Sequence, residues 1–83
     1  MDKVVVTVVI PSLSMHYDIS LPRYMTVSET VHLLSEALAG VTGNIYVPSN
    51  EELLCWHEKG IVLNRQKTIS DYGIKNGDLL YLY

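Results

Sequence analysis

The chain closes with Thr68-Ile-Ser-Asp-Tyr-Gly-Ile-Lys-Asn-Gly-Asp-Leu-Leu-Tyr-Leu-Tyr83, and this stretch decides the fold. Its first half predicts a short turn in which Ile69 and Ile74 supply the buried contacts. Asn76-Gly77-Asp78 is typical of a chain reversal, because Asn and Gly tolerate the left-handed backbone of tight turns. Leu79–Tyr83 then predicts a strand whose alternate side chains point to opposite faces of a sheet.

The beginning of the chain predicts a hairpin of two strands. Lys3–Ile10 is β-branched after its first residue, which favours a strand over a helix. Pro11–Ser14 interrupts this pattern with a turn. His16–Leu21 then alternates apolar and polar residues, as expected of a half-buried strand. Its apolar face carries Tyr17, Ile19 and Leu21.

An amphipathic helix is predicted next. Thr26-Val-Ser-Glu29 has the spacing of a capping box, in which the Thr hydroxyl and the Glu carboxylate satisfy early helical amides. Gly40 is expected to cap the carboxyl end of this helix. The residues that follow the box repeat at helical spacing and form one apolar stripe: Val27, Val31, Leu34 and Leu38.

The region between the helix and the closing segment predicts two more strands. Val41–Glu52 favours a loop, although its apolar run Ile45-Tyr46-Val47 indicates that part of it is anchored. Glu51-Glu52 is expected to be a solvated part of this loop. Leu53–His57 predicts a third strand, and Lys59-Gly60 a tight reversal. Ile61–Leu63 predicts a short fourth strand.

This element order predicts a single α+β domain over residues 1–83, the β-grasp (ubiquitin-like) arrangement. One helix would pack across a mixed four- or five-stranded sheet, in which the first and last strands are parallel neighbours.

Composition excludes several function classes. A net charge of −3 and six dispersed basic residues give no electrostatic footprint for nucleic acid. Cys55 is the only cysteine, so no internal disulfide can form, which favours a reducing compartment. The acidic start is a poor signal peptide, and the apolar run Val4–Ile10 is far too short to span a membrane. We therefore expect a cytoplasmic protein that does not insert into membranes.

Catalysis has one candidate in the sequence. Cys55 and His57 lie two apart on a predicted strand, so both face the same side and could form a Cys–His nucleophile. No carboxylate is placed to orient His57, and no glycine-rich loop accompanies the pair. A small strand residue beside a surface histidine is the favoured interpretation. We therefore predict no enzyme activity, no catalytic residue and no cofactor. We also predict no metal site, because His16 and His32 lie on other elements than Cys55 and His57.

Strand alternation predicts a binding surface instead. If Leu80 and Leu82 face the helix, the residues between them face the other side of the sheet. In the first strand we expect the polar Thr7 to face outward. Val5 and Val9, two positions to either side of it, then face outward as well. These outward positions predict an uncharged protein-binding patch of Val5, Val9, Cys55, His57, Leu79, Tyr81 and Tyr83. The alternative is that these residues serve cross-strand pairing alone.

The closing segment resembles that of ubiquitin, in Thr68-Ile-Ser-Asp-Tyr72, Ile74, Leu80 and Leu82. Within the superfamily the chain is similar to the YukD/EsaB group, small ubiquitin-like accessory proteins of bacterial type VII (WXG-substrate) secretion. These are related to the N-terminal domain of the membrane component EccD. The resemblance implies a non-catalytic adaptor or regulatory subunit that binds a cytosolic part of the secretion machinery. The predicted patch leaves a homodimer open as well, because a self-complementary patch can pair two copies of the chain.

Two alternatives stay open at this point. The first is an orphan ubiquitin-like interaction domain of another assembly. The second is a covalent modifier or sulfur carrier, which needs a C-terminal Gly-Gly that can be adenylated. Because the sequence ends at Tyr83 in a predicted strand, we expect a protein that is not conjugated.

Overall fold

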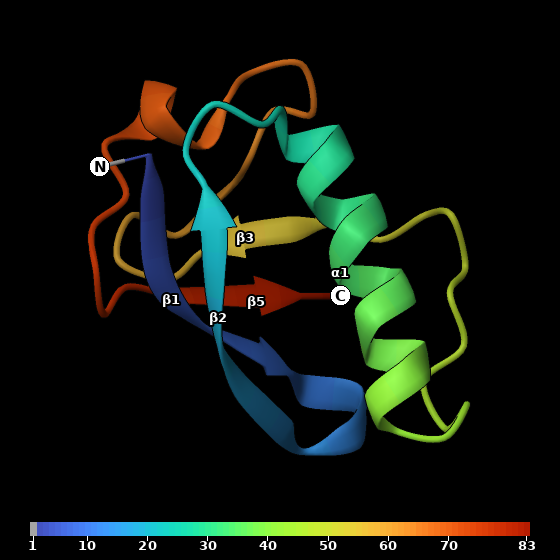
Figure 1. Cartoon of the computed structure of the whole chain (residues 1–83). Coiled ribbons are helices and arrows are strands. Elements are labelled where there is room, and N and C mark those ends of the chain that lie inside the picture. Colours follow the sequence, from blue (N-terminus) through green and yellow to red (C-terminus); the bar gives the residue numbers. More distant parts are fainter. Residues whose placement is uncertain (1) are drawn as a thin grey trace.

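The computed structural model describes residues 2–83 as one helix packed against a five-stranded mixed sheet, as the sequence predicts (Figure 1). Two short 3-10 helices, η1 and η2, lie in the connections. In chain order the elements are β1 (Lys3–Ile10), η1 (Pro11–Leu13), β2 (Met15–Pro22), α1 (Val27–Val41), β3 (Leu54–Trp56), β4 (Ile61–Val62), η2 (Ile69–Tyr72) and β5 (Leu79–Leu82).

The strands lie in the order β2-β1-β5-β3-β4, so the first and last strands of the chain are neighbours in the middle of the sheet. β1 and β5 run parallel, with Thr7 opposite Leu79 and Val9 opposite Tyr81. All other pairs are antiparallel. The predicted parallel pairing of the first and last strands is therefore confirmed.

The core lies between the sheet and α1. Val4, Val6, Val8 and Ile10 of β1 are buried, whereas Val5 is 49% exposed. This alternation follows from the strand's period of two, which sends successive side chains to opposite faces. The helix stripe and Leu80 and Leu82 of β5 complete the core as predicted. The other core residues are Leu21, Leu54, Trp56, Leu63, Ile69 and Ile74.

The helix begins where the sequence predicts and ends later. Thr26 Oγ1 accepts from the Glu29 N–H at 3.1 Å, and Glu29 Oε1 accepts from the Thr26 N–H at 3.0 Å. The prediction that Gly40 caps the carboxyl end is wrong, because α1 continues to Val41. Gly43, with a φ of 62°, takes the left-handed position instead. The N–H groups of Gly43 and Asn44 return to the carbonyls of Gly40 and Ala39, which closes the helix.

The connection between α1 and β3 is anchored by a buried carboxylate. Glu52 is only 4% exposed, so the prediction of a solvated Glu51-Glu52 pair is wrong for its second residue. Glu52 Oε2 accepts from the Tyr46 hydroxyl at 2.9 Å and from the Ser49 N–H at 2.8 Å. Burial raises the pKa of Glu52, but these hydrogen bonds together lower it below its ordinary value. A charged acceptor therefore holds together the connection between α1 and β3, which forms a loop beside the helix in Figure 1.

Glu52→Ala is expected to destabilise the fold by about 1–3 kcal/mol, because it leaves the Tyr46 hydroxyl and the Ser49 N–H without their acceptor. Equilibrium urea unfolding measures the loss. Glu51→Ala is the matched control, since Glu51 is exposed, and it should change stability by less than about 0.5 kcal/mol. Equal effects of the two substitutions would contradict the anchoring role of Glu52.

A second capping box fixes the turn before β5. Thr68 Oγ1 accepts from the Asp71 N–H at 3.2 Å, and Asp71 Oδ2 accepts from the Thr68 N–H at 2.9 Å. Tyr72 packs edge-on against Trp56 with ring centroids 6.3 Å apart. Its hydroxyl accepts from the Asn64 N–H at 2.7 Å. Through these contacts Asp71 caps the turn and Tyr72 packs it against the core.

Three carboxylates tie stability to pH. Hydrogen bonds from the Thr26 N–H and hydroxyl lower the pKa of Glu29, and those of Thr68 lower the pKa of Asp71. Glu52 is the third group with a lowered pKa. A carboxylate whose pKa is lower in the folded state stabilises the fold above its unfolded pKa, and this contribution disappears as pH falls through the folded value.

The melting temperature should therefore change little from neutral pH down to about pH 5, and then fall as pH drops through the ordinary carboxyl range toward about pH 2. Thermal unfolding followed by circular dichroism across this range is the measurement. A variant with Glu29→Gln, Glu52→Gln and Asp71→Asn should be less stable at neutral pH and should show a flatter acid limb. An acid limb of unchanged steepness would contradict the assignment to these three groups.

Candidate protein-binding surface

The sheet has one side that α1 does not cover, here called the open face (Figure 1). One row of side chains crosses it from strand to strand. Val9 of β1 lies opposite Tyr81 of β5, and Tyr81 lies opposite Cys55 of β3. Cys55 in turn lies opposite Val62 of β4. Since directly opposite residues share a face of the sheet, this row joins four strands into one uncharged surface.

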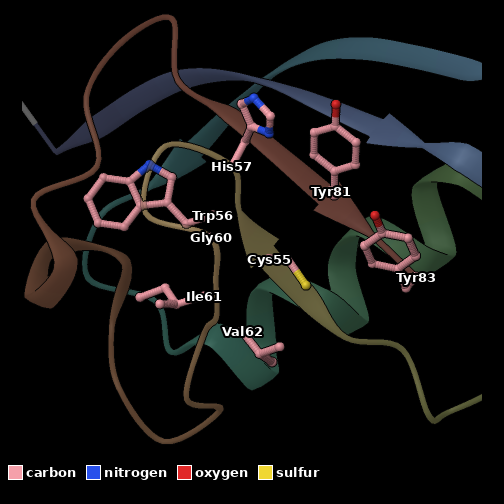
Figure 2. A pocket seen from close by; sticks show the side chains of 8 residues that line it. All are labelled: Cys55, Trp56, His57, Gly60, Ile61, Val62, Tyr81 and Tyr83. Atoms are coloured by element: carbon pink, nitrogen blue, oxygen red, sulfur yellow. The ribbon is translucent and has the colours of Figure 1, made fainter.

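Three rings stack along the middle of the open face. The imidazole of His57 lies 5.3 Å from the Tyr81 ring, with 24° between the planes. Tyr81 stacks in turn on Tyr83 at 6.1 Å and 23°. Figure 2 shows the three rings in a row, projecting from the same side of β3 and β5. Stacking restrains each ring, so this surface offers flat apolar area without a large loss of side-chain freedom on binding.

His57 lies just outside β3, which ends at Trp56 rather than at His57 as predicted. Its N–H still donates to the Leu79 carbonyl at 3.1 Å, and this bond keeps the imidazole beside Tyr81. The chain then turns, because Gly60 adopts a φ of 63° that favours glycine. The strand is shorter than predicted, but the placement of His57 on the open face is as predicted.

A shallow hollow of about 390 Å³ adjoins the rings. Tyr81 and Tyr83 border one side of it, and Ile61 and Val62 of the edge strand border the other (Figure 2). Trp56, which is 5% exposed, also contributes to its wall. The hollow gives the open face a concave end.

Two residues of the open face are not among those predicted from the sequence. Leu53 is 47% exposed and exchanges two backbone hydrogen bonds with Tyr83, so it lies beside that residue. The alternation that placed Cys55 outward also identifies Leu53. Val62 is 54% exposed, but Ile61–Leu63 is apolar at every position, and alternation there gives no signal for which residue faces outward.

Val5 stands apart from the other residues of the predicted patch. Its N–H donates to Asn76 Oδ1 at 2.9 Å, and its carbonyl accepts from the Gly77 N–H at 2.8 Å. Thr7, hydrogen-bonded to Asp18 at 2.7 Å, separates it from Val9. The contiguous part of the surface is therefore Val9, Leu53, Cys55, His57, Val62, Leu79, Tyr81 and Tyr83, and we call it the aromatic patch.

Cys55 and His57 lie on the same face, as the sequence predicts, but their surroundings favour packing over nucleophilic chemistry. Burial raises the pKa of the Cys55 thiol, which keeps it in the less reactive protonated form. The His57 ring is held against Tyr81 rather than in a charged site. Residues 2–83 contain no group of three His, Cys, Asp or Glu side chains placed to hold a metal ion.

A comparison with known protein families identifies the family of the chain. The family described as "WXG100 protein secretion system (Wss), protein YukD" matches residues 3–82. The chain belongs to the YukD family. A YukD protein is a component of the WXG100, or type VII, secretion system, so the predicted family is confirmed. No curated protein matches this sequence at a significant level.

Solved structures confirm a ubiquitin-like β-grasp fold for this YukD-family chain. It is similar to the EccD5 ubiquitin-like domain from Mycobacterium xenopi, with a TM-score of 0.80 and 16% identity over 100% of this chain and 94% of that chain. A chain of the MycP5-free ESX-5 inner membrane complex matches with a TM-score of 0.81 and 18% identity, over 100% of this chain and 21% of that chain. The UBL domain of Plasmodium falciparum Dsk2 matches with a TM-score of 0.75 and 15% identity, over 96% and 95%.

The helices of residues 2–83 include none with the length and apolar character needed to cross a lipid bilayer.

Proposed function

We propose that this YukD-family chain is a non-catalytic, single-domain adaptor or regulatory subunit of a type VII secretion system, and that it binds a protein partner through the aromatic patch. The observation that carries the proposal is the stack of His57, Tyr81 and Tyr83 on the open face. Stacked aromatic rings beside a hollow resemble the buried anchors that supply most of the energy of protein interfaces.

The composition of the aromatic patch supports binding rather than catalysis. It contains no Asp, Glu, Lys or Arg, and Leu53, Val62 and Tyr83 are 47%, 54% and 62% exposed. Contiguous exposed apolar surface is uncommon on monomeric proteins and marks interaction sites. Depletion of charge and enrichment in Tyr are also typical of the centre of an interface.

The partner we propose is a cytosolic part of the secretion machinery, with the chain itself in the cytoplasm. Similarity to a segment of a chain in the ESX-5 inner membrane complex supports this choice, because that segment is part of a larger membrane assembly. A partner of this kind needs an apolar surface with one protruding side chain that enters the hollow beside Val62.

Capture from the native cells tests the proposal. An N-terminally tagged copy is isolated, the eluate is divided between native and boiled denaturing gels, and every band is identified by mass spectrometry. We expect secretion components that co-elute under native conditions and separate on boiling. Capture of only a second copy makes a homodimer the occupant of the patch, and bands of higher mass that survive boiling contradict a non-conjugated adaptor.

A further inference from the structure

The edge strand β2 offers a second place for a partner to bind. β2 pairs with β1 over all eight residues without a bulge, and no other segment of residues 2–83 pairs with its outer edge. Proteins protect such edges with Lys, Pro or a bulge, since an unpaired edge accepts a strand from another chain. β2 has no Lys, and its only Pro is the last residue, Pro22.

The register shows which backbone groups point outward. β1 uses the backbones of Val5 and Thr7 to bond the segment before β5, with Gly77 N–H to Val5 O at 2.8 Å and Thr7 N–H to Asp78 O at 3.0 Å. Val4, Val6 and Val8 therefore bond to Leu21, Ile19 and Tyr17 of β2. The N–H and C=O groups that point away from the sheet belong to His16, Asp18 and Ser20.

A groove runs beside this edge on the helix side. Its volume is about 240 Å³, and its walls are Tyr17 and Ile19 of β2 and Ala37, Leu38 and Val41 of α1. Val41 is 66% exposed. A strand added to β2 would place every second side chain in this groove, because its side chains alternate between the two faces. The outward backbone groups and the groove therefore fit the same ligand.

The charges around the groove indicate which kind of added strand would bind there. Between Val4 and Glu58 the only Lys or Arg is Arg23, so neither β2 nor α1 provides a cation along the groove. Asp18 borders the groove through the edge strand, with its carboxylate on the open face beside Thr7, and Glu36 precedes Ala37 on α1. We propose that β2 and this groove bind an extended segment of another protein, with apolar side chains at alternate positions and Lys or Arg at its ends. Such a segment would extend the sheet as a sixth strand.

A second copy of the chain is a poorer occupant. Two β2 strands paired about a two-fold axis through Asp18, the central one of the three residues with outward backbone groups, would set Asp18 opposite Asp18 of the other copy. Like charges directly opposite each other destabilise a strand pair. The groove is also separate from the aromatic patch, so this site does not depend on the function proposed above.

Hydrogen exchange of single amides tests the site directly. The probe is the peptide Lys-Lys-Thr-Val-Thr-Val-Thr-Lys-Lys, added to the full chain and followed by nuclear magnetic resonance. In the free protein the amides of His16, Asp18 and Ser20 should exchange rapidly, whereas those of Tyr17 and Ile19 are protected by β1. Bound peptide should slow the exchange of the His16, Asp18 and Ser20 amides. A peptide with Glu in place of each Lys should bind about tenfold more weakly or not at all, equivalent to about 1.4 kcal/mol.

Two variants distinguish binding at this site from non-specific binding of the peptide. Ser20→Pro removes one outward N–H, which an edge strand tolerates, and should weaken binding about tenfold. Ala37→Arg fills the groove from an exposed helical position and should have at least the same effect. Leu33→Arg is the matched control, because Leu33 is exposed on α1 but does not line the groove, and it should bind as the wild type does.

Three results would overturn the proposal. The first is unchanged exchange at His16, Asp18 and Ser20 at a saturating peptide concentration. The second is equal binding of the Lys and Glu peptides. The third is protection of these amides without peptide that rises with protein concentration, because this would make a second copy the occupant. Retained protection at Tyr17 and Ile19 shows that Ser20→Pro is folded, and Ala37→Arg gives the same test without altering the strand.

Discussion

Tyr81→Asp is expected to abolish partner binding through the aromatic patch, with an affinity loss of about 100-fold or more. Truncating a central aromatic anchor costs about 2–4 kcal/mol. The substitution also places a carboxylate between Val9 and Cys55, where binding would strip its water without supplying a partner. It removes the middle ring of the stack as well, so His57 and Tyr83 lose the contact that orients them.

The measurement is co-capture of the identified partner, followed by titration calorimetry with the purified component. Tyr24→Asp is the matched control: Tyr24 is 71% exposed in the connection between β2 and α1, outside the sheet. It introduces the same charge and should leave affinity unchanged. Because Asp is disfavoured in strands, Tyr81→Asp should also cost about 1 kcal/mol of stability, which thermal unfolding checks. Wild-type affinity in a folded Tyr81→Asp protein would disprove binding through the patch.

The arrangement of the sheet follows closely from the sequence because alternation is a strong signal where one face is buried. Val4, Val6, Val8 and Ile10 all lie in the core, as the position of Thr7 predicts. The capping box at Thr26 and Glu29 can also be predicted from the sequence, because both of its hydrogen bonds connect residues three apart. Local chemistry therefore accounts for the strands of the hairpin and for the start of α1.

Features that depend on distant or competing contacts were harder to predict. Gly40 and Gly43 both fit a helix end, and the choice of Gly43 depends on the return of the Asn44 N–H to Ala39. Glu52 follows another glutamate in a polar stretch, so its burial has no local signal. Its role depends on Tyr46, six residues earlier, whose hydroxyl reaches back to it at 2.9 Å.

The open face shows the same division between local and distant information. Alternation places Cys55, Leu79 and Tyr81 outward, and the structure agrees. The separation of Val5 from them could not be predicted, because it depends on the register between β1 and β5. That register puts Thr7 beside Leu79 and leaves Val5 next to the turn that contains Asn76.

Leu80→Ala is expected to give the largest loss of stability, about 2–5 kcal/mol. Leu80 is fully buried at the centre of the sheet, opposite Val8 of β1 and Trp56 of β3. Shortening it opens a cavity against α1 that neighbouring strands cannot close without breaking their pairing. An 83-residue domain has a small core, so this loss is a large part of a typical stability of about 5–15 kcal/mol. Urea unfolding measures it.

Leu79→Ala is the control that connects stability with binding. Leu79 is the same residue type one position earlier and is 36% exposed on the open face. It should cost less than about 1 kcal/mol of stability, yet weaken partner binding because it borders Tyr81 and His57. Leu80→Ala should instead leave the affinity of the folded fraction unchanged. Since a one-residue slip exchanges the two faces of a strand, the reverse pattern would mean that β5 pairs in a different register.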